Sequence, residues 1–173
     1  MDMKRALSAA ALVATVTSAG WAATGQAKVA GTASGSAVSG VVKFEETKSG
    51  LKVIADLQGI APGNHGFHVH EFGDCSDSGK AAGGHYNPRN TKHGDIMKDG
   101  AKMAHAGDMG NVTVDATGAA HIEALLPDLT LSGGKHAVGG RAVILHEKAD
   151  DFGQPVGNAG GRIGCGPIII TGN

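Results

Sequence analysis

Apolar and polar residues alternate with a period of two over much of this 173-residue chain. Over residues 51–57 the apolar side chains take every second position, which places them on one face of an extended segment. The same alternation predicts strands over 38–46, 66–72, 112–115, 120–126, 142–147 and 167–171. Turns rich in glycine separate these segments, and long helical periodicity is missing. The pattern therefore predicts an all-β sandwich or barrel.

Two long polar segments, 73–109 and 148–166, interrupt the alternation. Loops of this length inside a compact domain are usually functional or disordered. Residues that bind metals or anions crowd into them: Cys75, His85, His93, His105 and Asp108 in the first, and Asp150, Asp151, Arg162 and Cys165 in the second. We therefore expect the function to reside in these two loops.

The N-terminal residues 1–22 have the pattern of a secretory signal peptide. Lys4 and Arg5 precede a short Ala/Val/Leu run, and small residues lead to an expected cleavage site near Ala22. The apolar run is too short to span a membrane. A first helix packed on the domain is the alternative. We expect residues 23–173 to form one domain, located in the periplasm or secreted, without a stable membrane anchor.

Composition and charge narrow the class of protein further. The chain is 41% hydrophobic with a formal net charge of -1, which suits one domain with its own core. There is no basic stripe, so nucleic acid is not the expected partner. Cys75 and Cys165 are an even pair in an exported chain, which predicts a disulfide; two buried free thiols are the alternative.

His68 and His70 lie two residues apart in a strand-like segment. Both imidazoles therefore leave the same face, about 6.6 Å apart along the strand. Such a pair could share copper, zinc, iron or nickel, although an isolated pair is more often the polar face of an edge strand. Further candidate ligands occur in three other segments: His85, His93, His105, Asp108, His146 and Asp150. Three histidines with one aspartate would make a plausible tetrahedral zinc site.

Five motifs, taken in order, resemble those of the copper/zinc superoxide dismutase family: GFHVHEFGDC, GGHYNP followed by KHG, HAGDMGN, GGRAVILHEKADDFG and GNAGGRIGCG. The resemblance covers roughly residues 36–170, and the region around Cys75 is closer to secreted bacterial members. It implies a Greek-key β-sandwich or barrel of about eight antiparallel strands with two long functional loops. It also implies an enzyme that converts superoxide to oxygen and hydrogen peroxide by alternate reduction and reoxidation of a histidine-bound copper.

The resemblance assigns a role to individual residues and implies one copper and one zinc per chain. The implied copper ligands are His68, His70, His85 and His146. The implied zinc ligands are His85, His93, His105 and Asp108, so that His85 bridges the metals and can deliver a proton. Asp150 would accept hydrogen bonds from His68 and His93, and Arg162 would draw the anionic substrate to copper. The remaining histidines match no ligand position and are interpreted as ordinary polar residues: His65, His121 and His136.

Two functions other than catalysis are compatible with this fold. A copper/zinc storage or delivery protein could use the same fold without turnover, but it would need neither the His85 bridge nor Arg162. A purely structural sandwich would leave the aligned ligands unexplained. The sequence therefore favours an enzyme acting on superoxide. The loop that supports dimer contacts in animal members is altered, so both a monomer and a homodimer remain open.

Overall fold

The computed structural model describes residues 22–172 of the chain. The predicted signal peptide, residues 1–22, lies outside the described residues except for Ala22. Eight strands make up the domain: β1 (Thr24–Gly31), β2 (Ser39–Thr47), β3 (Gly50–Gln58), β4 (Gly63–His70), β5 (Asp108–Val114), β6 (Ala120–Leu126), β7 (Ala142–His146) and β8 (Arg162–Gly172). A 3₁₀ turn, η1 (Lys80–Ala82), and one short helix, α1 (Ile96–Asp99), lie between β4 and β5.

The eight strands form one antiparallel sheet in the order β5-β4-β7-β8-β1-β2-β3-β6. Several neighbours are distant in sequence, since β1 pairs with β8, β3 with β6 and β4 with β7. The two outermost strands, β5 and β6, contact each other, so the sheet curls into a nearly closed barrel. This arrangement confirms the predicted all-β Greek-key fold with about eight antiparallel strands.

The barrel interior is filled by the apolar positions that the alternation predicts. In β3 the side chains at 51, 53, 55 and 57 are all buried, while the residues between them are partly or fully exposed. In β4 the alternation is lost, because every residue from His65 to His70 is buried. The inner face of this strand packs on the core, and its outer face is covered by loops. His68 and His70 lie in this doubly covered part of β4.

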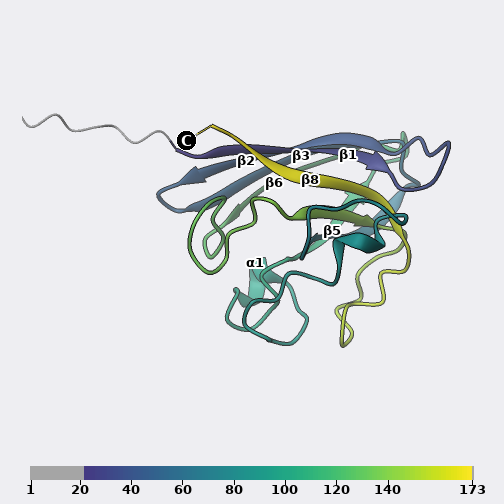
Figure 1. Ribbon diagram of the computed structural model, residues 1–173. Helices are drawn as coiled ribbons and strands as arrows, with labels where there is room; N and C mark the ends of the chain where they lie inside the picture. The colour runs from purple at the N-terminus through teal and green to yellow at the C-terminus, as the bar shows by residue number, and fades with distance from the viewer. Residues whose placement is uncertain (1–21, 173) are drawn as a thin grey trace, which may run out of the picture.

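Figure 1 shows the connection from β4 to β5, in teal, and that from β7 to β8, in yellow-green, extending from the same side of the sheet. These connections contain the two long polar segments. The disulfide predicted between Cys75 and Cys165 is present and joins the first of them to β8. A third long connection, residues 127–141, leads from β6 to β7 and was not singled out by the sequence pattern. No helix within residues 22–172 combines the length and apolar character needed to cross a membrane.

Candidate metal centre

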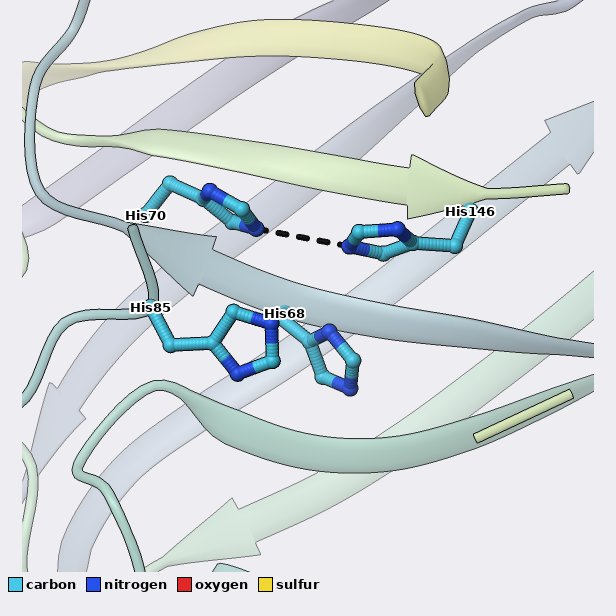
Figure 2. A group of neighbouring side chains, drawn as sticks. All are labelled: His68, His70, His85 and His146. Atoms are coloured by element: carbon cyan, nitrogen blue, oxygen red, sulfur yellow. Dashed lines mark hydrogen bonds between the residues drawn. The ribbon is translucent and has the colours of Figure 1, made fainter. Parts of the chain in front are cut away.

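Four histidines gather where the second half of β4 runs antiparallel to β7, beside the first long loop. His68 and His70 come from β4, His146 is the last residue of β7, and His85 forms an isolated bridge with His70. Each offers a ring nitrogen within 4.8 Å of the others, and all four side chains are buried. In Figure 2 the rings of His70 and His146 point at each other, with 3.3 Å between their Nε2 atoms. The imidazoles of His68 and His70, two residues apart on one strand, therefore point toward the same place.

A second buried cluster contains His85, His93, His105 and Asp108, again with ligand atoms within 4.8 Å of one another. The carboxylate of Asp108 is its centre. Its Oδ1 lies 2.8 Å from Nδ1 of His85 and 3.1 Å from Nδ1 of His105. Its Oδ2 lies 2.9 Å from Nδ1 of His93. His85 belongs to both clusters, so the two candidate sites share one imidazole.

The hydrogen bonds of the clusters leave specific ring nitrogens free. Nε2 of His68 bonds to Asp150, and its buried Nδ1 has no hydrogen-bond partner among the described residues. The same holds for Nδ1 of His93, whose short contact to Asp108 lacks hydrogen-bond geometry. Buried polar atoms without a partner are uncommon because they lose their hydration. One such nitrogen in each cluster fits a metal ion at each site.

Burial keeps the imidazoles of His70 and His146 neutral. Desolvation, followed by repulsion from His85, lowers the pKa of His70 to about 2. Desolvation, followed by repulsion from His68, lowers the pKa of His146 to about 3. Nδ1 of His70 donates to the carbonyl of Gly83 at 3.0 Å, which leaves Nε2 as the unprotonated nitrogen. A neutral imidazole with a free nitrogen is the form that binds a metal.

Asp150 connects the two clusters and is itself buried. Its Oδ2 accepts a hydrogen bond from His68 at 2.9 Å, and its Oδ1 accepts one from His93 at 2.9 Å. Burial alone would raise the pKa of this carboxyl group, but the two histidine hydrogen bonds hold it well below its ordinary value. Asn111 of β5 fixes the backbone of Asp150 on both sides, through bonds of 2.7 and 2.8 Å. The sequence motifs predict no role for Asn111.

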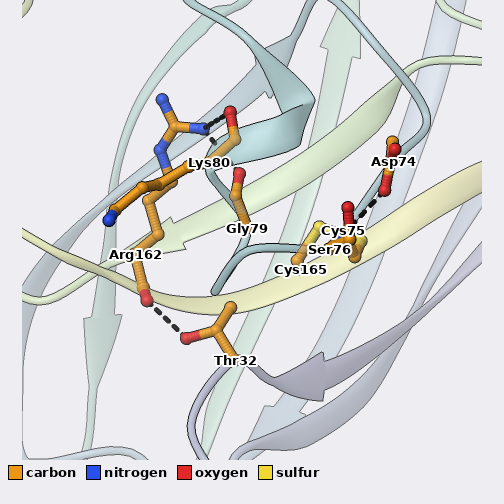
Figure 3. Close-up of a disulfide and its surroundings, with 8 residues drawn as sticks. All are labelled: Thr32, Asp74, Cys75, Ser76, Gly79, Lys80, Arg162 and Cys165. Atoms are coloured by element: carbon orange, nitrogen blue, oxygen red, sulfur yellow. Dashed lines mark hydrogen bonds between the residues drawn. A yellow bond between two sulfur atoms is a disulfide. The ribbon is translucent and has the colours of Figure 1, made fainter.

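Arg162 begins β8 and turns its guanidinium toward the first long loop. It donates to the carbonyls of Gly79 and Gly83, each at 2.6 Å. Gly83 also accepts from His70, so the guanidinium lies beside the four-histidine cluster. Figure 3 shows Arg162 beside Gly79 and Lys80, together with the disulfide that anchors the same loop to β8. The hydrogen bonds to the loop carbonyls and the disulfide between this loop and β8 therefore hold Arg162 in place.

The three histidines without an assigned role lie outside both clusters. His121 is exposed and pairs with Asp56, and His136 accepts a hydrogen bond from Arg89. His65 differs from these two because it is buried and bonds to the carbonyls of His146 and Ala61, each at 2.8 Å. It therefore supports the backbone of one cluster member. No spacing in the sequence signals this contact, which depends on how the strands pair.

The Greek-key β-barrel contains two buried clusters of metal-ligand residues, and the clusters share the imidazole of His85. These features are those of a metal-binding protein. The model of the family described as copper/zinc superoxide dismutase matches residues 38–168. The extracellular Cu-Zn superoxide dismutase of Brugia pahangi is 36% identical over 144 residues, covering 78% of this chain and 70% of the relative. The Cu-Zn superoxide dismutase of Onchocerca volvulus is 37% identical over 148 residues, covering 79% and 91%.

Two further relatives extend the comparison to another curated enzyme and to a solved structure. Cu-Zn superoxide dismutase A of Xenopus laevis is 42% identical over 139 residues, covering 76% of this chain and 89% of the relative. The crystal structure of the clock protein EA4 superposes with a TM-score of 0.75 at 37% identity, covering 86% of this chain and 94% of that chain. The chain belongs to the copper/zinc superoxide dismutase family. It is an enzyme that dismutates superoxide to oxygen and hydrogen peroxide, and its metal cofactors are copper and zinc.

Proposed function

We propose that each cluster binds one of the two metals and that His85 binds both metals. In this proposal copper is held by His68, His70, His85 and His146. Zinc is held by His85, His93, His105 and Asp108. The position of His85 carries the proposal: its Nδ1 faces Asp108 at 2.8 Å, while its ring centroid lies 4.2 Å from that of His68 and 4.9 Å from that of His70.

The ligand sets suit the metals assigned to them. A carboxylate with three imidazoles is a common tetrahedral zinc environment, whereas a cluster made only of imidazoles accommodates copper. Copper supplies the electron transfer when bound, since it can take an electron from one superoxide and return it to the next, while zinc has no redox role. The protein residues must then supply protons and attract the anion.

His85 is the proposed proton donor. An imidazole that serves two metals has lost both ring protons, so it becomes a proton acceptor as soon as one nitrogen is released. Its Nδ1 is turned toward Asp108, which leaves Nε2 facing the four-histidine cluster. A proton taken up at Nε2 can pass to the second superoxide as it is reduced, and water supplies the other proton of hydrogen peroxide.

Arg162 is proposed to attract superoxide. Among the described residues its guanidinium contacts carbonyl oxygens and no carboxylate, so its positive charge is not neutralised locally. Charges of this kind raise the association rate of an anion by about 10-fold to 1000-fold, less at high salt. The carbonyls of Gly79 and Gly83 hold the guanidinium beside the four-histidine cluster instead of leaving it free in solvent.

Replacing Arg162 by alanine should therefore lower kcat/KM for superoxide by roughly 10-fold and weaken its dependence on ionic strength. Stopped-flow decay of superoxide at several salt concentrations measures both quantities. Arg89→Ala is the matched control, because Arg89 is an exposed arginine whose guanidinium bonds to His136, outside both clusters. Equal rates and equal salt dependence in the two variants would contradict the role of Arg162.

The function itself is tested with mature protein loaded with copper and zinc. Superoxide decay is measured at catalytic protein concentration, with free copper chelated and the metal-free protein as the control. Fast decay that requires the bound metals is expected. Stoichiometric copper binding without any acceleration would instead support the storage or delivery function.

The proposal includes export and cleavage after residue 22, so that residues 23–173 act in the periplasm or outside the cell without a membrane anchor. The disulfide supports this location, because such bonds persist in oxidising compartments. The relative from Brugia pahangi is named as extracellular. Mass spectrometry of the exported protein should give a chain that begins at Ala23, and an intact residue 1 would refute the cleavage.

For the assembly we propose a homodimer that covers the outer side of β8. Ile169 is 57% exposed there and lines a shallow hollow together with Pro167, two residues away on the same face of the strand. Light scattering should give twice the chain mass, and Ile169→Lys should give a monomer. A monomeric wild-type protein at micromolar concentration would refute this assembly.

A further inference from the structure

We propose that Gln154 is a positioning residue that holds the zinc ligand His93 in place through its backbone. The inference rests on the proposed function, in which His93 binds zinc. Gln154 lies in the loop between β7 and β8, whereas His93 lies in the loop between β4 and β5. The contact therefore joins the two long loops at the metal centre.

The amide of Gln154 pairs with both backbone polar groups of His93. Its Oε1 accepts from the backbone N–H of His93 at 3.1 Å, and its Nε2 donates to the carbonyl of His93 at 2.9 Å. A glutamine amide has one acceptor and two donor hydrogens, so this pairing uses its two ends at once. Two bonds from one planar group fix the position and the orientation of a peptide segment, which a single bond cannot do.

The same loop holds the His93 side chain from other directions. Asp150 bonds to its Nε2 at 2.9 Å, and the ring of Phe152 stacks near its face with centroids 6.4 Å apart. Gly157 passes so close that a Cβ there would collide with Asp150 and lie 2.5 Å from Nε2 of His93. Four residues of one loop therefore lie against His93, and Gln154 is the one that holds its backbone.

The turn that carries Gln154 is closed by its own backbone. The N–H of Gly157 donates to the carbonyl of Gly153 at 2.7 Å, and the N–H of Asp151 donates to the carbonyl of Gly157 at 2.9 Å. Gln154 extends from the tip of this closed turn and is itself exposed. Because the turn has its own hydrogen bonds, loss of the Gln154 amide should release His93 without unfolding the loop.

Outer contacts of metal ligands typically change metal affinity by about 10-fold to 100-fold when removed. Gln154 acts on the backbone instead of the ring, so we expect the lower end of that range. Copper should be affected less, since Asp150 is held by Asn111 and keeps its bond to His68. Loss of the Gln154 amide should therefore weaken zinc binding more than copper binding.

The test uses the mature chain with cobalt(II) in the zinc position, because cobalt(II) absorbs visible light with an intensity and band positions that report the ligand geometry. The rate of zinc release to a chelator is measured in parallel. The variants are Gln154→Ala and Gln154→Glu, the latter keeping an acceptor for the His93 N–H but losing the donor. Val156→Ala is the matched control, since Val156 is exposed in the same turn.

We expect Gln154→Ala to release zinc about 10-fold faster than wild type and to shift the cobalt bands, with Gln154→Glu intermediate. Val156→Ala should match wild type in both measurements. The inference is overturned if Gln154→Ala and Val156→Ala behave alike, or if both glutamine variants keep the wild-type spectrum and release rate. His93→Ala separates the two levels: an unchanged cobalt spectrum in that variant would overturn the zinc assignment, and this inference with it.

Discussion

Replacing His146 by alanine is expected to abolish copper binding and superoxide dismutation while the fold and the zinc site remain. His146 contributes to the four-histidine cluster and takes no part in the second cluster. Its Nε2 is 3.3 Å from Nε2 of His70, so removal of its ring leaves the proposed copper with three imidazoles and an open side. Loss of a direct ligand should exceed the 10-fold to 100-fold effect of outer contacts, so we expect more than about 100-fold weaker copper binding.

Metal analysis, superoxide decay and thermal unfolding of the same preparation test this prediction together. His121→Ala is the matched control, because His121 is a strand histidine outside both clusters. The His146 variant should retain zinc, the disulfide and cooperative unfolding. Full activity with stoichiometric copper in this variant would refute the proposed copper site. A loss of zinc as large as the loss of copper would refute the proposed division of ligands.

Replacing Cys165 by serine is expected to produce the largest loss of stability. The disulfide joins residues 90 apart, and chain-entropy models assign such a loop about 4 to 5 kcal/mol. Cys165 is also buried against Ala82 and Ile144, where a hydroxyl group would have to be desolvated. For a domain of this size that loss corresponds to a melting temperature lower by about 10 °C or more.

Calorimetry of the metal-free protein measures this change without the contribution of metal binding. Cys75→Ser is the matched control for the bond, and the two variants should lose similar stability if the cross-link is the main cause. Both should also lower kcat/KM, since the disulfide anchors the loop whose carbonyls position Arg162. An unchanged melting temperature in both variants would show that the cross-link does not stabilise the fold.

The period-two pattern predicted the class of fold most directly through strands such as β3, which buries one face and exposes the other. It did not predict β1, and it predicted only residues 167–171 of β8. The first half of β8 contains Gly164 and Gly166, which interrupt the apolar pattern, and this half is extended because it pairs with β7 and β1. Tertiary pairing, and not local preference, therefore forms these strands.

The ligand-type residues could be found from the sequence because histidine and aspartate are chemically distinctive and fall into recognisable motifs. The contacts that support them could not be found in this way. Asn111, Gln154 and His65 all bond to backbone groups of residues at least 39 positions away. Any polar side chain of suitable length could make such contacts, so they become visible only when the loops are placed in space.

Under the proposed assignment, Asp150 would couple the copper site to the zinc site. One carboxylate accepts hydrogen bonds from His68 and from His93, so the orientation of each imidazole influences the other. A metal bound at one site would fix the orientation of Asp150 and so order part of the other site before its metal binds. Thermodynamic reciprocity then requires that zinc strengthen copper binding by the same factor by which copper strengthens zinc binding. On this assignment the two cofactors should bind cooperatively, so that a partly loaded population favours empty and fully loaded molecules.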